Sequence, residues 1–288
     1  MLLLDGKKLA HEIEQELKQK IASKPQQRAP CLVAILTTDN PASHTYVSRK
    51  ARACQQVGII SRVLKLQPQT TEELIALIHN LNHDSTVDGI LVQLPLPRHI
   101  EQMRVLESVD PMKDVDGFHP VNVGRMLLGD ERAFCPCTPL GIKVLLQRYS
   151  IDVSKKHVVI VGRSNIVGKP LACMLMQNAP GCNATVTVAH SHTPDLKQIS
   201  LSADILVAAC GRPNLITADM VQDGAVVIDV GINQVADASK SSGYSLVGDV
   251  DFPALSKKVS AITPVPGGVG PMTIAMLLQN TLRFWGQA

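Results

Sequence analysis

The sequence contains one stretch whose local structure follows from its residues alone: Val158-Val159-Ile160-Val161-Gly162-Arg163-Ser164-Asn165-Ile166-Val167-Gly168-Lys169-Pro170. A run of four β-branched residues predicts a fully buried strand, and Gly162 ends that run. Pro170 suits the first turn of a helix, where its missing N–H costs nothing. A turn followed by a helix N-terminus presents backbone N–H groups and a positive dipole end to an anion, which is how α/β proteins hold a dinucleotide.

The glycines of this stretch follow a G-x5-G spacing, whereas the common dinucleotide fingerprint is G-x-G-x-x-G, so the spacing alone leaves a purely structural turn open. A ribose 2′-hydroxyl usually meets an Asp or Glu about twenty residues beyond the glycines. Here the predicted strand 184–189 is followed by His190 and Ser191, and the first acid is Asp195. Arg163, Ser191 and the neighbouring imidazoles would instead accommodate a 2′-phosphate, which favours NADP over NAD.

Composition limits the class of protein. With 288 residues the chain is long enough for two domains, and 45% hydrophobic residues exclude disorder. The net charge of +3, without any long basic run, is too mild for a nucleic-acid partner and suits an anionic small molecule better. No window of eighteen apolar residues predicts a membrane span, and Met1-Leu2-Leu3-Leu4 is too short for a signal peptide.

The seven cysteines include no C-x-x-C pair, and Cys135 and Cys137 are too close in sequence for a normal zinc pair. Asp114 and Asp116 flank a turn before Gly117, but no third ligand stands at a fitting spacing, so no metal is predicted. We therefore expect reduced thiols in a cytoplasmic protein.

Two series of alternating strands and helices are predicted. Each series is typical of a parallel sheet covered on both faces, so the chain is expected to be an α/β protein with two α/β units and no internal repeat. Helix starts are marked by Asn40-Pro41 and by the capping box Thr70-Thr71-Glu72-Glu73. The predicted strands are 31–36, 59–66, 87–94, 158–161, 184–189, 204–209, 224–230 and 260–263; the predicted helices lie between 41 and 58, over 70–81, over 138–149 and over 271–285.

Four side chains in the first half are candidates for chemistry. Tyr46 and Lys50 share a helix face at i, i+4 spacing, and a lysine in a partly dry site can exchange protons near neutral pH. Gln93 stands at the carboxyl end of a buried strand, where α/β sheets bind ligands, and Asp116 can accept hydrogen bonds from a heterocycle. Each also has an ordinary interpretation: a surface lysine beside a packed tyrosine, a glutamine bonded to backbone, and a turn aspartate.

The segment from Thr263 to Pro271 joins a strand to a helix and contains three prolines and three glycines. Such a loop offers exposed backbone and close approach to a ligand. Linkers have similar composition, though rarely between such apolar flanks.

Taken together, these motifs resemble those of the bifunctional methylenetetrahydrofolate dehydrogenase/methenyltetrahydrofolate cyclohydrolase family. The matching motifs stand in the same order across nearly the whole chain. Two departures are Thr37-Thr38, where the family usually has an apolar residue and Gly, and His192, where Lys or Arg is common. The motifs are Pro41-Ala42-Ser43 leading to Tyr46 and Lys50, Val92 to Pro97, Lys113 to Gly117, Pro136 to Pro139, Val161 to Pro170, and Pro264 to Thr273.

The resemblance implies a folate-binding catalytic domain (1–139 plus 272–288) and a Rossmann-like NADP-binding domain (140–271), joined by long helices around a cleft, in a homodimer. It implies Lys50 as general acid/base, Gln93 as its partner, Tyr46 beside the pterin and Asp116 as the pterin anchor. The segment Pro264 to Gly268, including Gly267, would line the folate. Gly162, Arg163, Ser164, Ser191 and Ile232 would contact the cofactor.

The implied activity is NADP-dependent oxidation of 5,10-methylenetetrahydrofolate, then hydrolysis of the methenyl product to 10-formyltetrahydrofolate. Hydride loss removes no hydroxyl proton, so the first step needs positioning, whereas hydrolysis needs an acid/base such as Lys50. Two alternatives are another NADP-dependent oxidoreductase on a similar scaffold and a non-catalytic NADP-sensing protein.

Overall fold

A computed structural model describes residues 1–240 and 243–286, which form two compact units. One unit comprises residues 11–137 and 274–288, and the other comprises residues 1–10 and 138–273. We call them the three-stranded unit and the six-stranded unit after their main sheets. The chain crosses from one to the other within α1 (Gly6–Ala22) and α10 (Val269–Thr281), and at the start of α6 (Cys137–Arg148).

The predicted domain boundaries are wrong for the first ten residues. Strand β1 (Leu2–Leu3) pairs in parallel with β11 (Ala261–Ile262), so the sheet of the six-stranded unit holds the start of the chain. The pairing joins the first residues of the chain to a strand near its end, which local sequence patterns do not reveal. Residues 287 and 288 of the predicted range 272–288 lie outside the described part of the chain.

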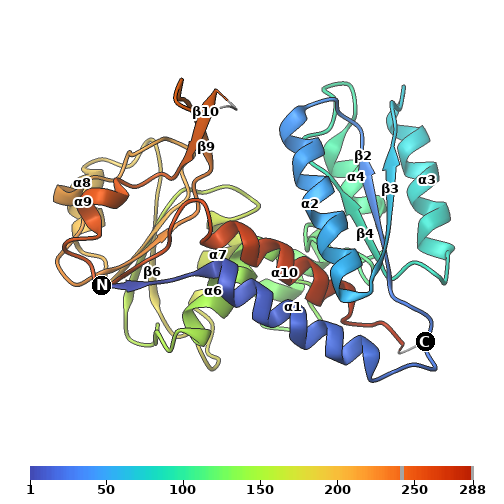
Figure 1. The fold of residues 1–288 in the computed structure, drawn as a ribbon, viewed down its shortest axis with the longest axis horizontal. Coiled ribbons are helices and arrows are strands. Elements are labelled where there is room, and N and C mark those ends of the chain that lie inside the picture. Colours follow the sequence, from blue (N-terminus) through green and yellow to red (C-terminus); the bar gives the residue numbers. More distant parts are fainter. Residues whose placement is uncertain (241–242, 287–288) are drawn as a thin grey trace. The chain divides into compact units, whose positions relative to one another are not determined.

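The three-stranded unit is built on a parallel sheet of order β3-β2-β4, as its predicted strand–helix alternation requires. The central strand is buried along its whole length, and α2 and α3 lie on either side of the sheet (Figure 1). The elements are β2 (Cys31–Leu36), α2 (Pro41–Val57), β3 (Ile60–Lys65), α3 (Thr71–His83) and β4 (Gly89–Val92).

Local signals fix the helices of this unit. Thr70 caps α3 by accepting a hydrogen bond from the Glu73 N–H, while the Glu73 carboxylate accepts from the N–H of Gln69. The helix packs Leu74 and Ile78 into the apolar core against β2 and β4. Two shorter helices that the sequence analysis did not predict, α4 (Gln102–Ser108) and α5 (Pro120–Leu127), follow β4.

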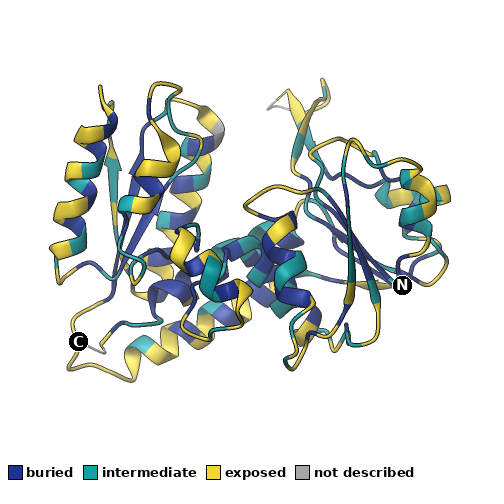
Figure 2. Ribbon diagram, turned by 180° about the vertical axis from the view of Figure 1, so that it is seen from behind, coloured by how far each residue is buried: buried dark blue, intermediate teal, exposed yellow. Residues whose placement is uncertain are grey.

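The six-stranded unit has a wholly parallel main sheet of order β1-β11-β8-β7-β5-β6. Its strands are mostly buried, as their β-branched composition predicts (Figure 2). An antiparallel hairpin of β9 (Asn233–Ala236) and β10 (Tyr244–Val247) was not predicted. The remaining strands are β5 (His157–Val161), β6 (Thr185–Ala189), β7 (Ile205–Ala208) and β8 (Val226–Asp229).

The helices of this unit follow the strands. Pro170 lies in the first turn of α7 (Gly168–Leu175), as predicted. Helix α10 ends at Thr281 rather than near Trp285, whose indole N–H donates instead to the Arg28 carbonyl oxygen at 2.8 Å. The other helical elements are α8 (Leu196–Leu201), the 3-10 turn η1 (Ala218–Met220) and α9 (Phe252–Leu255).

None of the helices in the described residues is both long and apolar enough to cross a membrane. All seven cysteines lie within the described ranges, and each is a free thiol.

Candidate active site and cofactor cavity

Lys50 lies in the middle of α2 with only 5% of its surface exposed. Its Nζ donates a hydrogen bond to Oε1 of Gln93 at 3.2 Å and lies 4.9 Å from the centre of the Tyr46 ring. The i, i+4 spacing on α2 brings the phenol and the amine together, as predicted. The surface-lysine interpretation is therefore wrong, because this amine is buried and held by a side chain from another element.

Gln93 is the residue directly after β4, and its backbone N–H still pairs with the Ile35 carbonyl of β2. Its Nε2 donates to the carbonyl oxygen of Leu94 at 2.8 Å. Because this bond occupies the amide nitrogen, the amide oxygen faces the lysine. The glutamine thus connects the carboxyl edge of the sheet to α2.

Asp116 lies in the loop that follows α4, partly exposed. Burial raises the pKa of its carboxyl above the ordinary value, and the positive charge of Lys50 opposes that rise. Through this electrostatic interaction the Asp116 carboxylate is coupled to the Lys50 amine. The preceding acid, Asp114, is buried and accepts hydrogen bonds from the N–H groups of Phe118 and His119, so it shapes the loop from within.

Two residues that the sequence analysis did not select support Asp116. The buried thiol of Cys137 donates to the Val115 carbonyl at 3.3 Å and lies 3.7 Å from Oδ1 of Asp116. Nδ2 of the buried Asn280, on α10, donates to the same carbonyl at 2.8 Å. Burial raises the pKa of the Cys137 thiol, so it stays protonated and acts as a donor. Cys137 lies within the motif Pro136 to Pro139, and the sequence signal for Asn280 is a polar residue within an apolar helix.

One departure from the family motif lies at the carboxyl end of β2. Thr37 is 4% exposed, and the described residues offer no hydrogen-bond partner to its Oγ1. The other departure, His192, is exposed, and its backbone N–H donates to Nδ1 of His190. The Lys50 amine is held by Gln93 and Tyr46, so the lysine group is built without either departure.

A cavity of about 570 Å³ opens beside the carboxyl ends of β5 and β7 in the six-stranded unit. Four of the five predicted cofactor residues line it: Gly162, Arg163, Ser164 and Ser191. The remaining lining residues, which sequence reasoning selected only in part, are Val161, His190, Thr193, Leu196, Ala209, Cys210, Arg212 and Leu215.

The floor of this cavity requires glycine. Gly162 has φ +137°, and a Cβ there would overlap the Ala209 carbonyl oxygen. A Cβ on Gly168, at the start of α7, would overlap the Gly162 carbonyl. The two glycines of the G-x5-G stretch therefore bring the helix N-terminus directly onto the turn, the arrangement that suits a phosphate group.

Ile232, the fifth predicted cofactor residue, lies outside the lining of that cavity and is 56% exposed. Its Cδ1 is instead close to Gly270, where an added Cβ would meet it at 3.6 Å. Ile232 is thus a neighbour of the proline- and glycine-rich loop.

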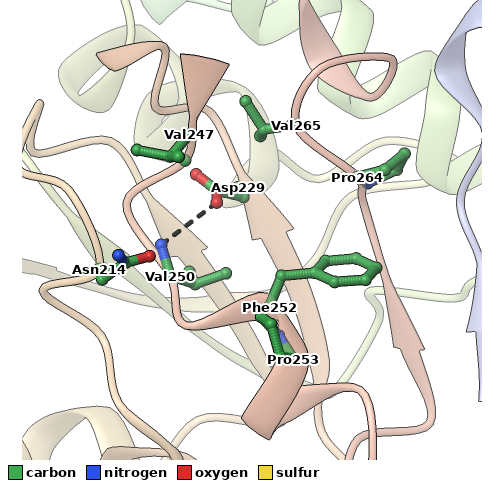
Figure 3. A pocket seen from close by; sticks show the side chains of 9 residues that line it. Asn214, Asp229, Val247, Val250, Phe252, Pro253, Pro264 and Val265 are labelled. Atoms are coloured by element: carbon green, nitrogen blue, oxygen red, sulfur yellow. Dashed lines mark hydrogen bonds between the residues drawn. The ribbon is translucent and has the colours of Figure 1, made fainter. Parts of the chain in front are cut away.

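That loop is held by the start of α1. The Lys7 N–H donates to the Gly267 carbonyl at 2.8 Å, and a side chain at Gly6 would overlap the Gly268 carbonyl. Gly267 itself has φ +113°, which favours glycine. Pro264 lines a second, smaller cavity of about 230 Å³ together with Asp229 and Phe252 (Figure 3).

Family comparisons cover both halves of the chain. Residues 4–116 match the model of the tetrahydrofolate dehydrogenase/cyclohydrolase catalytic domain. Residues 136–288 match the model of the NAD(P)-binding domain of the same family.

Similar proteins agree over the full length. A "Bifunctional protein FolD" of Protochlamydia amoebophila (strain UWE25) is 56% identical, over 100% of this chain and 98% of the relative. A crystal structure of a bifunctional FolD methylenetetrahydrofolate dehydrogenase/cyclohydrolase from Campylobacter jejuni has a TM-score of 0.93 at 54% identity, covering 98% of each chain. A Trypanosoma brucei FolD structure, complexed with NADP cofactor and inhibitor, has a TM-score of 0.93 at 39% identity, covering 99% of this chain and 97% of that one. The chain belongs to the tetrahydrofolate dehydrogenase/cyclohydrolase family.

Proposed function

We propose that this protein oxidises 5,10-methylenetetrahydrofolate with NADP and then hydrolyses 5,10-methenyltetrahydrofolate to 10-formyltetrahydrofolate. The observation that carries the proposal is the buried amine of Lys50, hydrogen-bonded to Gln93 and covered by the Tyr46 ring. The Lys50 amine is thus held in a fixed orientation for proton transfer. Hydrolysis of 5,10-methenyltetrahydrofolate, a cyclic amidinium, requires such a group.

Four side chains have separate roles in the proposed hydrolysis. Water adds to the methenyl carbon and must lose a proton, and one ring nitrogen must gain a proton as its bond to that carbon breaks. Lys50 transfers these protons, and Gln93 fixes its amine by accepting a hydrogen bond from it. Asp116 accepts hydrogen bonds from the N–H groups of the pterin, and the Tyr46 ring packs on its flat face.

The oxidation needs chiefly a site for the cofactor. A bound NADP would supply the hydride acceptor for the methylene carbon. The cavity beside Gly162 fits this group, because its glycine floor admits a phosphate at the start of α7 and Arg163 and Ser191 supply polar contacts for a 2′-phosphate. Ile232, a neighbour of the proline- and glycine-rich loop, is proposed to contact the cofactor, and Pro264, Gly267 and Gly268 of that loop are proposed to line the folate.

We further propose a homodimer in the cytoplasm, with folates as small-molecule partners. The seven free thiols support a reducing compartment. Sedimentation equilibrium tests the dimer: a single species at the monomer mass of 31.0 kDa would contradict it.

One incubation tests the function. The purified protein is mixed with 5,10-methylenetetrahydrofolate and NADP, and the absorbance spectrum is followed. Reduced cofactor together with the transient methenyl chromophore supports the proposal. Reduction of NADP only when a cyclic hydroxy acid replaces the folate would indicate a different oxidoreductase, and cofactor binding without turnover of either substrate would indicate a sensor.

A further inference from the structure

Asp249 is completely buried and holds the loop that follows β7. Its Oδ2 accepts hydrogen bonds from the backbone N–H groups of Cys210 at 2.7 Å and Gly211 at 2.9 Å, and its Oδ1 accepts from the N–H of Arg212 at 3.0 Å. Three consecutive N–H groups thus converge on one carboxylate. Because Cys210 and Arg212 line the 570 Å³ cavity, this carboxylate sets the position of one wall of it.

The loop has the form of an anion-binding nest. Gly211 has φ +64°, the left-handed conformation that lets successive N–H groups point to one side. In many proteins such a nest receives an external anion. Here the anion is Asp249 of the same chain, so the three N–H groups donate to Asp249 and not to a ligand. Other atoms of Cys210 and Arg212 form the cavity wall.

A second carboxylate holds the first in place. Oδ1 of Asp229 accepts from the Asp249 N–H at 2.9 Å, and its Oδ2 accepts from the Val250 N–H at 3.2 Å (Figure 3). Glycine is required on both sides, because a Cβ on Gly248 would overlap Asp229 and a Cβ on Gly231 would overlap Asp249. The chain of contacts runs from the end of β8 through Asp249 to the cavity wall.

We infer that Asp249 is a positioning residue for the cofactor: it orders the Cys210–Arg212 loop before NADP binds. The inference rests on the proposed function only for the identity of the cofactor. Because the Cys210–Arg212 loop is already ordered, it loses less conformational entropy when NADP binds. The affinity for NADP therefore depends on Asp249, although this residue lies outside the cavity lining.

Asp249→Asn tests this, because the amide keeps the shape but turns an NH₂ group toward backbone donors. We expect the Kd for NADP, measured by calorimetry, to rise at least about tenfold. Hydrolysis of methenyltetrahydrofolate without NADP, which depends on Lys50 in the other unit, should stay within about twofold of wild type. Asp251→Asn is the matched control: its carboxylate caps α9 by accepting from the Ala254 N–H, which an asparagine also does.

A folded Asp249→Asn protein with the wild-type Kd overturns the inference. If that variant fails to fold by circular dichroism, Gly211→Ala decides, since its Cβ would enter open space and strain only the left-handed turn. A similar rise in Kd supports the inference, and an unchanged Kd overturns it. Absence of methenyl hydrolysis in the wild-type protein would overturn the proposed function instead and leave the ratio of Kd values informative.

Discussion

Lys50 and Gln93 are 43 residues apart in sequence, yet the lysine Nζ lies 3.2 Å from the glutamine Oε1. The bond joins the middle of a helix to the carboxyl end of the strand β4. The Gln93 amide nitrogen already donates to the Leu94 carbonyl, which fixes the orientation of the amide group. The amide oxygen therefore points toward Lys50 and fixes the position of the lysine amine. The amine is therefore positioned by the fold before any substrate binds.

Replacing Lys50 by methionine removes the amine while keeping most of the side-chain volume. We expect methenyl hydrolysis to fall by a factor of about 100 or more, because general acid–base catalysis contributes that much. The decay of the methenyl chromophore measures this, and calorimetry should show an unchanged Kd for NADP. Arg49→Met, an exposed cation one residue away, is the control. Unchanged hydrolysis in Lys50→Met would remove the lysine from the mechanism.

Asp116→Asn should raise the KM for methylenetetrahydrofolate about tenfold, because one of the two accepting carboxylate oxygens becomes an NH₂ donor that faces the N–H groups of the pterin. Since burial raises the pKa of Asp116, the wild-type KM should also rise as the pH falls, at a pH above that of an ordinary carboxyl, as the acceptor becomes protonated. The asparagine variant should lack this pH dependence. Steady-state kinetics across the pH range measure both effects, and Asp110→Asn is the control, which should follow the wild-type pH dependence of KM. An Asp116→Asn protein that also followed it would contradict the prediction.

Arg163→Ala should discriminate between the two dinucleotides. The exposed guanidinium lines the cavity, and its loss removes a charge-assisted contact available only to a 2′-phosphate. The Kd for NADP should rise about tenfold while that for NAD stays nearly constant. Lys169→Ala is the matched control, since that cation is bonded to Asn165 outside the cavity lining. An equal rise in the Kd for NADP and for NAD would indicate that Arg163 contacts a part of the dinucleotide that both cofactors share.

The free energy of unfolding should depend on pH through the ionisation of Asp229. Burial raises its pKa from 3.8 to about 6, despite the N–H groups that it accepts from. A raised folded-state pKa favours the folded state below about pH 4, and this contribution is lost as the pH rises through about 6. The unfolding free energy of wild type relative to Asp229→Asn should therefore fall by roughly 2 kcal/mol between pH 4 and pH 7. Urea titrations at several pH values measure it, and a constant difference would show that the N–H groups fully offset the effect of burial on the pKa.

Sequence reasoning succeeded where structure is local. The stretch from Val158 to Pro170 forms the predicted strand, turn and helix start, and Thr70 caps α3 as its motif requires. Both parallel sheets followed from the alternation of strands and helices. The tyrosine–lysine pair followed from helical spacing, which needs no tertiary information.

Failures arose where distant segments meet. The pairing of Leu2 with Ala261 rests on two-residue strands, too short for any periodic signal. The β9–β10 hairpin is largely exposed and has no buried face to impose alternation. Likewise, nothing near Asp249 in sequence shows that its partners are residues 210–212, because the contact depends on how β7 and β10 are brought together.

The two groups of side chains come from separate parts of the chain, and this has an evolutionary consequence. The lysine group draws on residues 46–116, and the dinucleotide cavity draws on residues 161–215. Substitutions that change the preferred dinucleotide can therefore be confined to residues 161–215, without altering Lys50 or Gln93. Over evolution, coenzyme preference is thus open to change while the lysine group stays constant.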